Sequence, residues 1–173
     1  MRAFVNELAR AEIGRTFNQY ACNARLCERL RAYLDARAAA SILLVGEAAG
    51  YRGARVSGLP FTSERQVTGD PPGEASATVV HRVLAELGAA DHVLLWNLVP
   101  THPHLPGKPD SNRRPTRTEI EAGRPFLQRL ARGRRVIPVG RLAQAELGGC
   151  YVRHPSHGGE RDFRTSLLEW LDG

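Results

Sequence analysis

Short apolar runs alternate with stretches of helical periodicity along this chain, and that alternation constrains its fold more than any other feature. Apolar residues at helical spacing follow the first, second and fourth runs. This order predicts an α/β domain, so we expect one domain over residues 1–173, with a central, mostly parallel four-stranded sheet flanked by helices. The four runs with the length and content of buried strands are residues 41–46, 92–99, 135–139 and 150–153.

Local signals refine these expected elements. A capping box, formed either by Thr116 with Glu119 or by Thr118 with Glu121, marks the start of the helix after the second run. Pro138 places the third run beside a sheet edge, because proline has no N–H to donate to a strand ladder. The first 38 residues have the pattern of amphipathic helix.

The composition excludes several classes of protein. Of the 173 residues, 42% are hydrophobic and 24% are charged, which is typical of a globular rather than a disordered chain. No apolar run approaches the roughly 20 residues that span a bilayer, and the N-terminus resembles neither a signal peptide nor a transit peptide. Three cysteines are too few for a disulfide framework. We therefore expect a cytoplasmic protein without a membrane partner.

The charge balance is basic, because 24 lysine and arginine residues against 18 aspartate and glutamate residues give a formal net charge of +6. Only Lys108 is a lysine, and the planar guanidinium of arginine suits bidentate contact with phosphate. Two explanations stay open: a surface that binds nucleic acid, or a compositional bias of the genome towards alanine and arginine.

Polar side chains follow three of the predicted strands. Glu47 lies in a glycine-bounded loop after the first run, Asn97 lies at the end of the second, and His154 follows the fourth. Because ligands of such sheets bind beyond the carboxyl ends of the strands, we expect a carboxylate, a carboxamide and an imidazole at one edge. Each has a structural alternative, as a solvated or capping glutamate, a loop-pairing asparagine and a hydrogen-bonded structural histidine.

The segments that carry these residues resemble, in order and spacing, the uracil-DNA glycosylase superfamily. The resemblance implies an enzyme that flips a damaged base out of DNA and hydrolyses its N-glycosidic bond. It extends from the first predicted strand to the C-terminal helix. The matching segments are GEAAGYRGARVSGLPF (46–61), WNLVP (96–100), NRRPTRTEIEAGRPFL (112–127), VIPVGRLA (136–143) and RHPSHGG (153–159).

The resemblance implies a role for each residue of the expected site. Phe61 matches the phenylalanine that stacks on the base, although an aromatic residue after proline is more often part of the core. Gly46 belongs to the loop whose backbone faces the base, and Asn97 matches the asparagine that hydrogen-bonds O4 and N3–H of uracil. His154 matches the histidine that donates to uracil O2 as negative charge develops there. Glu47 matches the residue that orients a water molecule or supports the cation-like sugar.

The same resemblance implies DNA that contains a deaminated base as the partner of a monomeric protein. The loop after the histidine enters the minor groove in the family, and Ser156, His157 and Gly158 occupy it here, with His157 as its only large side chain. Arg113 and Arg114 flank the site and are candidates for phosphate contacts. The alternative is that these arginines have no such role, because the exposed loops of a chain this basic are commonly rich in arginine.

Two residues depart from the family pattern. Ala49 replaces the usual proline, which predicts a less rigid glycine loop, and Ala48 replaces the aspartate that activates water in some branches. Glu47 is then the only carboxylate of this loop. We expect a repair glycosylase for uracil or another deaminated base, with a catalytically weak or silent lesion-binding relative as the alternative. A hydrolase of free nucleosides is less favoured, because such an enzyme needs neither a loop that enters the minor groove nor a basic net charge.

No cofactor or metal is expected. Iron–sulfur members of the family carry four cysteines, whereas Gly123 occupies one of those positions here. Cys22 and Cys27, five residues apart, would lie about 140° apart around a helix and do not form half of a cluster site. His102 and His104 are expected in a solvated loop, because no further metal ligand lies at suitable spacing. The glycine loop matches neither a dinucleotide nor a triphosphate fingerprint.

Overall fold

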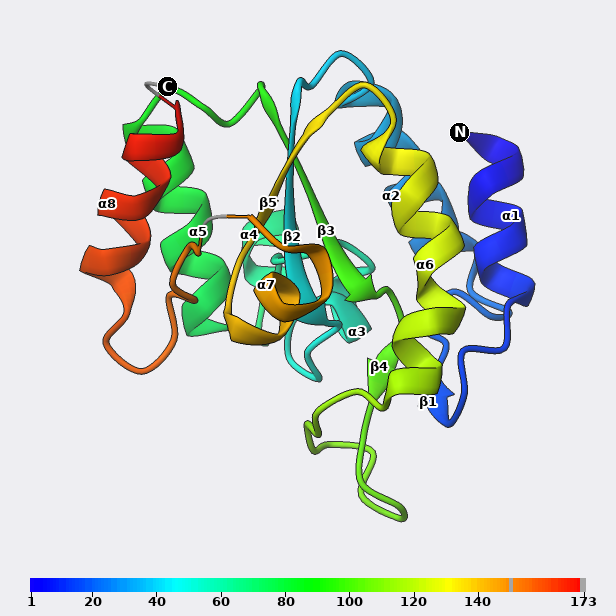
Figure 1. Ribbon diagram of the computed structural model, residues 1–173. Coiled ribbons are helices and arrows are strands. Elements are labelled where there is room, and N and C mark those ends of the chain that lie inside the picture. The colour runs from blue at the N-terminus through cyan, green and yellow to red at the C-terminus, as the bar shows by residue number, and fades with distance from the viewer. Residues whose placement is uncertain (150, 172–173) are drawn as a thin grey trace.

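Helices cover both sides of a central sheet in the computed structural model, which describes residues 1–149 and 151–171 (Figure 1). The α/β class predicted from the alternation of strands and helices is confirmed. In chain order the elements are α1 (Arg2–Arg10), β1 (Thr16–Phe17), α2 (Ala24–Ala36), β2 (Ile42–Ala48), α3 (Ala54–Ser57), α4 (Glu64–Thr68), α5 (Ala75–Glu86), β3 (Val93–Val99), β4 (His102–Pro103), α6 (Arg117–Ala131), β5 (Arg135–Pro138), α7 (Arg141–Leu147) and α8 (Glu160–Leu171).

The central sheet has three parallel strands in the order β3, β2, β5. β2 is the middle strand, and its Gly46 lies opposite Asn97 of β3. Pro138 lies in the edge strand β5, where the sequence placed it, and pairs in register with Val45 of β2. After β2 the chain forms β3 on one side of this strand and then crosses to form β5 on its other side. In such sheets the reversal of strand order opens a crevice beyond the carboxyl end of the middle strand.

The prediction of a fourth strand over residues 150–153 is wrong. Val152 makes a single parallel bridge with Val139, just beyond β5, and residue 150 lies outside the described residues. Tyr151 and Arg153, on either side of Val152, are only partly buried, so among residues 151–153 Val152 alone packs fully into the core. The pairing with β5 therefore does not continue beyond one bridge. A two-stranded antiparallel ladder of β1 with β4 forms instead, and no apolar pattern predicted it.

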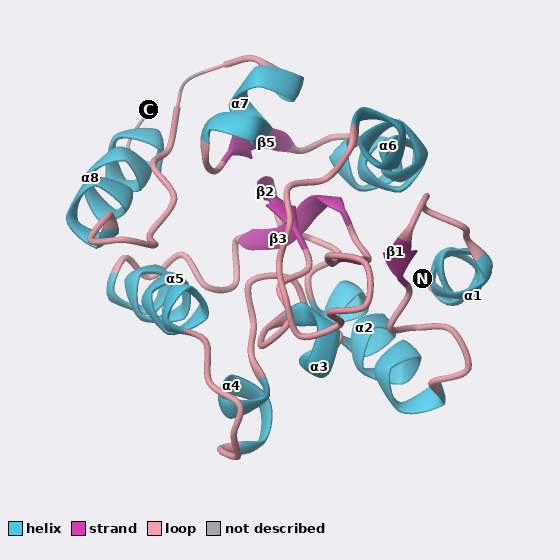
Figure 2. Ribbon diagram, turned by 90° about the horizontal axis from the view of Figure 1, so that it is seen from below, coloured by secondary structure: helices cyan, strands magenta, loops and turns pink. Residues whose placement is uncertain are grey.

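Apolar side chains alternate between the two faces of the sheet. Leu43 and Val45 of β2 belong to a core with α1, α2 and α6, whereas Leu44 belongs to a second core with α5 and α8. Figure 2 shows these two groups of helices on opposite sides of the strands. Because both faces are covered, the strands consist mainly of consecutive apolar residues, and this is why the sequence pattern predicted them.

Capping residues set the bounds of two helices. The segment predicted as one amphipathic pattern divides into α1 and α2, and Asn23 Oδ1 begins α2 by accepting a hydrogen bond from Leu26 N at 3.2 Å. Of the two possible capping boxes before α6, the structure has Thr116 with Glu119. Within the described ranges, no helix is both long and apolar enough to cross a membrane.

Candidate active site

A cavity of about 170 Å³ opens where β2 and β3 end. The four residues whose side chains were predicted to bind the base or act in catalysis line it: Glu47, Phe61, Asn97 and His154. It is smaller than the roughly 300–1,000 Å³ of pockets for drug-sized ligands, so it suits a single flat base. The other lining residues are Ala48, Ala49, Gly50, Ala54, Glu74, Ser76, Ala77, Pro103, Asn112 and Arg113.

Phe61 forms one wall of the cavity. Its backbone has a φ of +51°, in the left-handed region that side-chain-bearing residues rarely adopt. Its ring stacks on that of His154, with 6.3 Å between the centroids and 30° between the planes. A Cβ atom on Gly46 would lie 2.3 Å from the Phe61 ring and 2.9 Å from Asn97 Oδ1. Only glycine at position 46 therefore lets the ring and the carboxamide close on the same space.

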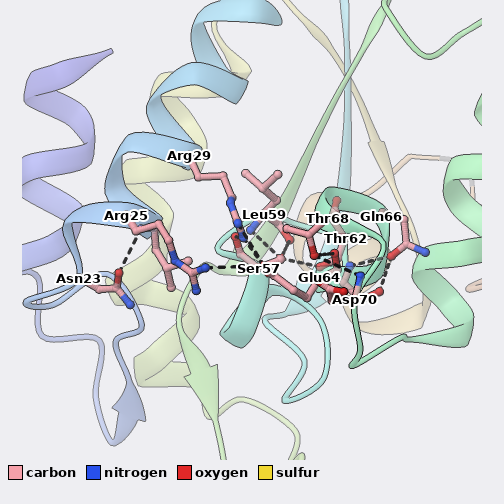
Figure 3. A network of polar contacts seen from close by, with 12 residues as sticks. Asn23, Arg25, Arg29, Ser57, Leu59, Thr62, Glu64, Gln66, Thr68 and Asp70 are labelled. Atoms are coloured by element: carbon pink, nitrogen blue, oxygen red, sulfur yellow. Dashed lines mark hydrogen bonds and ion pairs between the residues drawn. The ribbon is translucent and has the colours of Figure 1, made fainter.

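An arginine of α2 holds the segment that carries Phe61, residues 57–64, which we call the Phe61 turn. Arg29 Nη1 donates to the Ser57 carbonyl at 3.0 Å and to Glu64 Oε2 at 2.7 Å, and Nη2 donates to Glu64 Oε1 at 3.1 Å. The guanidinium thus bridges the two ends of the turn (Figure 3). Both partners are mostly buried, with side chains 16% and 10% exposed.

Further contacts fix the middle of the Phe61 turn. Ser57 Oγ donates to the Thr62 carbonyl at 2.6 Å, and Tyr20 Oη donates to the Gly58 carbonyl at 2.9 Å. Thr62 Oγ1 lies 2.9 Å from Nε2 of His81, a residue of α5 whose pKa burial lowers. Segments on both sides of the sheet therefore hold the aromatic wall in place.

The carboxamide of Asn97 faces the cavity with its hydrogen-bonding capacity unused. The residue is 4% exposed and lies within β3, opposite Gly46. No hydrogen bond joins its Oδ1 or Nδ2 to a described residue, and neither atom is sealed from the cavity that the residue lines. A rigid, unpaired carboxamide at a cavity wall is suited to reading one donor and one acceptor of a ligand.

His154 presents an N–H to the cavity. Ser156, predicted to contact DNA, contacts this ring: its backbone N donates to His154 Nδ1 at 3.2 Å, and its Oγ lies 2.8 Å from the same atom. Because a backbone N–H can only donate, Nδ1 accepts, and the neutral ring carries its hydrogen on Nε2. Burial and the nearby His157 lower the pKa of His154, which keeps the ring neutral at pH 7.

Glu47 supplies a carboxylate from the end of β2. Burial raises the pKa of Glu47, and the neighbouring Arg114 guanidinium opposes that shift. No ion pair or hydrogen bond to a described side chain engages this carboxylate, so it is available to a ligand or a water molecule in the cavity.

His102 is buried, so the prediction of a solvated loop histidine is wrong. The residue is 0% exposed. Its Nδ1 lies 2.8 Å from the Ala49 carbonyl and its Nε2 lies 3.2 Å from the Pro109 carbonyl, while its ring stacks on that of His104. The contact with the Ala49 carbonyl attaches β4 to the glycine loop.

The remaining residues predicted to contact DNA divide into one engaged and three exposed side chains. The Arg113 guanidinium donates to both carboxylate oxygens of Glu119 at 2.6 and 2.8 Å, and Glu119 is 2% exposed. Arg114 is exposed beside the cavity. His157 and Gly158 are exposed at a sharp turn after His154, with φ of +53° and +74°.

Three polar residues of the cavity were not predicted as site residues: Glu74, Ser76 and Asn112. Asn112 Oδ1 accepts a hydrogen bond from Tyr51 N at 3.0 Å and so ties the loop after β4 to the glycine loop. Glu74, expected only as the start of a helix, brings a second carboxylate into the cavity, and burial raises its pKa. No local motif marks this residue, because its place depends on Gly50 and Gly53, against which its carboxylate lies.

The described ranges contain no group of three histidine, cysteine, aspartate or glutamate side chains placed to hold a metal ion. Cys22 is exposed and Cys27 is partly buried, both as free thiols, while Cys150 lies outside the described residues. The cavity instead offers an aromatic face, a carboxamide, an N–H donor and two carboxylates, which are suited to binding a planar polar ring and moving protons beside it.

Comparisons with known proteins bear on this cavity. A family model described as the uracil DNA glycosylase superfamily matches residues 34–169, which is most of the chain. The crystal structure of wild-type SMUG2 from Pedobacter heparinus matches with a TM-score of 0.66 and 12% sequence identity, over 98% of this chain and 99% of that chain. At this identity the match shows a shared fold. No curated protein matches the chain.

Proposed function

Because the chain belongs to the uracil-DNA glycosylase superfamily, we propose that it removes uracil or another deaminated base from DNA by hydrolysing the N-glycosidic bond of a flipped nucleotide. One observation carries this proposal: the cavity joins a stacking face, a carboxamide without a protein partner among the described residues and an N–H donor around room for a single flat base. A base inside a duplex reaches such a cavity only by extrusion, so the proposed partner is DNA that contains the deaminated base.

Asn97 reads the Watson–Crick edge of the base in this proposal. Its Nδ2 donates to O4 of uracil and its Oδ1 accepts from N3–H, while Phe61 stacks on the ring. The position of Asn97 within β3 and the contacts of the Phe61 turn support this role, since both groups are fixed before a base arrives.

His154 stabilises the departing base. As the C1′–N1 bond breaks, its electron pair moves onto the base and is delocalised to O2. The Nε2–H of His154 donates to O2, where this negative charge develops. The hydrogen bond from Ser156 to Nδ1 supports the assignment, because it leaves the single hydrogen of the neutral ring on Nε2.

Glu47 acts on the side of the sugar. Loss of the base leaves positive charge near C1′, and an ionised carboxylate stabilises it and accepts a proton from the attacking water. The water oxygen bonds to C1′, and the products are the free base and an abasic site. The half-buried setting of Glu47, without a protein partner among the described side chains, supports this role.

Exposed residues beside the cavity contact the DNA. His157 enters the gap that the flipped base leaves in the stack, and Gly158 allows the backbone to approach the minor groove. Arg114 contacts a phosphate. The guanidinium of Arg113 is engaged by Glu119, so Arg113 serves to position the loop before α6.

Recognition of a lesion without excision is a second candidate function. It is favoured by Ala48 and Ala49, which leave Glu47 as the only carboxylate on the loop from Gly46 to Gly50. Release of the base distinguishes the two functions, because both require binding and only the glycosylase leaves an abasic site.

Labelled oligonucleotides with uracil, hypoxanthine or xanthine at one position test the proposal. Purified protein should create alkali-labile sites at a deaminated base. His154→Ala should lower the excision rate by about 10²–10³-fold with little change in DNA affinity, because it removes one preorganised donor. His92→Ala, which removes an exposed histidine outside the cavity, is the matched control.

Other outcomes of the oligonucleotide experiment would favour the second function or contradict the proposal. Tight binding of damaged DNA without cleavage would favour lesion recognition. Absence of both binding and cleavage would contradict both functions, and full activity of His154→Ala would contradict the role given to that residue.

A further inference from the structure

The mechanism above leaves one carboxylate of the cavity, that of Glu74, without a task. Glu74 precedes α5, but its side chain makes no capping hydrogen bond with that helix. Arg52 and Arg65 line a groove on its other side, yet neither forms an ion pair with it, and burial is the only cause of its raised pKa. Among the described residues Glu74 thus has no hydrogen-bonding or ion-pairing partner, and its partly buried carboxylate lies between the cavity and that groove, within reach of a ligand in the cavity.

Glu74 lies at the end of the glycine loop away from Asn97. A Cβ atom on Gly53 would lie 2.1 Å from Glu74 Oε2, and one on Gly50 would lie 2.9 Å from Oε1. Asn97 instead approaches Gly46, where the same loop begins. A base that presents its Watson–Crick edge to Asn97 therefore turns a different edge towards Glu74.

A deaminated purine and uracil differ at that second edge. Hypoxanthine offers Asn97 the same pair of groups as uracil, a carbonyl acceptor beside an N–H donor. On the other side of that carbonyl, the purine carries the acceptor N7, whereas uracil has C5–H. A carboxyl group that retains its proton donates to N7, while an ionised carboxylate repels its lone pair. Burial without an opposing cation keeps Glu74 protonated to higher pH than an exposed glutamate.

We propose that Glu74, as a carboxylic acid, donates a hydrogen bond to N7 of a deaminated purine and thereby extends the cavity from uracil to hypoxanthine-like bases. This inference rests on the proposed glycosylase function. As the C1′–N9 bond breaks, its electron pair passes into the imidazole ring of the purine, and the proton of Glu74 moves to N7. Water supplies the oxygen that bonds to C1′ and gives its proton to Glu47. Exchange with solvent then returns Glu47 to its ionised form and Glu74 to its protonated form, so the protons balance.

The test is the ratio of single-turnover excision rates for hypoxanthine and uracil in otherwise identical oligonucleotides, from about pH 5 to about pH 8. The other charged and titratable groups around Glu74 are Glu47, His154 and Arg113 in the cavity and Arg52 and Arg65 in the groove. They meet both substrates, so their effects largely cancel in the ratio.

The wild-type ratio should fall as the pH rises, because Glu74 loses the proton that N7 needs. Glu74→Gln keeps an N–H donor at every pH and should make the ratio independent of pH. Glu74→Ala should lower the ratio by about 10²-fold. Glu169→Gln, an exposed substitution on α8 that removes the same charge, should keep the wild-type ratio.

Free bases as competitors of uracil excision give a second measurement on the wild-type protein. Hypoxanthine should inhibit about tenfold more strongly than 7-deazahypoxanthine, which lacks the N7 acceptor, and Glu74→Ala should remove this difference. Equal inhibition by the two bases in the wild type would overturn the inference, even if no Glu74 variant folds.

The remaining outcomes separate the inference from the function on which it rests. If Glu74→Ala keeps the wild-type ratio of excision rates, whether both rates fall equally or neither falls, Glu74 has only a structural role and the inference is overturned. A wild-type protein that excises uracil but not hypoxanthine would also overturn it, with the proposed function intact. Excision of neither base would refute the proposed function and the inference together.

Discussion

The carboxamide of Asn97 offers the base one donor and one acceptor, and its buried position makes a mismatch costly. In Asn97→Asp, an ionised carboxylate would face O4 of uracil with like polarity. Uracil excision should fall by about tenfold to a hundredfold, for a loss of roughly 1–3 kcal/mol, and cytosine should be relatively favoured. The measurement is the ratio of excision rates on matched uracil and cytosine oligonucleotides.

Asn6→Asp, an exposed substitution on α1, is the control for this change of charge. If Asn97→Asp keeps the wild-type ratio, Asn97 does not read the base and belongs to the structure of β3 alone.

Glu47 should set the acid limb of the pH profile for uracil, because its proposed role requires the ionised form. Burial raises the pKa of Glu47, so excision should decline as the pH falls through this raised value. Glu47→Gln should lower the rate at neutral pH and flatten that limb. Its stability at neutral pH should not fall, since a raised pKa means that the charged form is disfavoured by folding. An acid limb that persists in Glu47→Gln would assign the titration to another group.

At the residue scale, sequence reasoning found the side chains that follow strands and missed those placed by distant contacts. Asn97 and His154 were located from expected strand ends together with the family resemblance, and Phe61 from the resemblance alone. All three line one cavity. His102 was misplaced because its burial depends on a carbonyl 53 residues earlier in the chain. Glu74 was missed because space for its carboxylate exists only once the glycine loop has folded against α5.

At the scale of elements, α2 lies mostly before residue 34, where the family match begins, yet it anchors the Phe61 turn. Arg29→Met should destabilise the fold by about 3–5 kcal/mol, because it leaves the carboxylate of Glu64 buried without its partner. The looser turn should also raise KM for uracil-containing DNA. Arg25→Met is the matched control: Arg25 lies 3.8 Å from the same carboxylate but is 67% exposed, so its loss should cost less than about 1 kcal/mol.

The same ion pair has a pH signature in the free energy of unfolding. The Arg29 guanidinium holds the pKa of Glu64 below its usual range. The unfolded chain therefore binds the proton more readily, and this stabilisation is present above the ordinary glutamate pKa and lost as the pH falls through the lowered value. The stability difference between wild type and Arg29→Met should narrow in acid. Equal urea midpoints for both proteins at neutral pH would contradict the clamp.

Element prediction succeeded where burial is continuous and failed where pairing is brief. β2 and β3 are covered on both faces, so apart from Glu47 and Asn97 near their carboxyl ends their runs are apolar, and the patterns of the helices that cover them were equally clear. The ladder of β1 with β4 joins two residues to two others far along the chain, which no periodicity can indicate. Val152 makes only one bridge, so the short run over residues 150–153 led to the prediction of a strand that the sheet does not contain.

At the scale of the whole molecule, the net charge of +6 predicts salt-sensitive binding to DNA. The logarithm of the association constant should fall with the logarithm of salt concentration, with a slope near −0.9 for each phosphate contacted. Arg114→Gln should reduce the slope by about one such unit, whereas Arg132→Gln, exposed after α6, should leave it unchanged. Fluorescence anisotropy at a series of salt concentrations measures both, and a slope near zero would remove the nucleic-acid partner.

The imidazole of His102 lies between two carbonyl oxygens but, when neutral, has only one hydrogen for them. Burial lowers the pKa of His102, so the ring is neutral at pH 7. The shorter contact, 2.8 Å from Nδ1 to the Ala49 carbonyl, takes that hydrogen, and at 3.2 Å the lone pair of Nε2 then faces the Pro109 carbonyl. The glycine loop is thereby attached, while the loop after β4 is mildly repelled. A single added proton would turn that repulsion into attachment, so the two loops that border the cavity differ in how firmly the protein holds them.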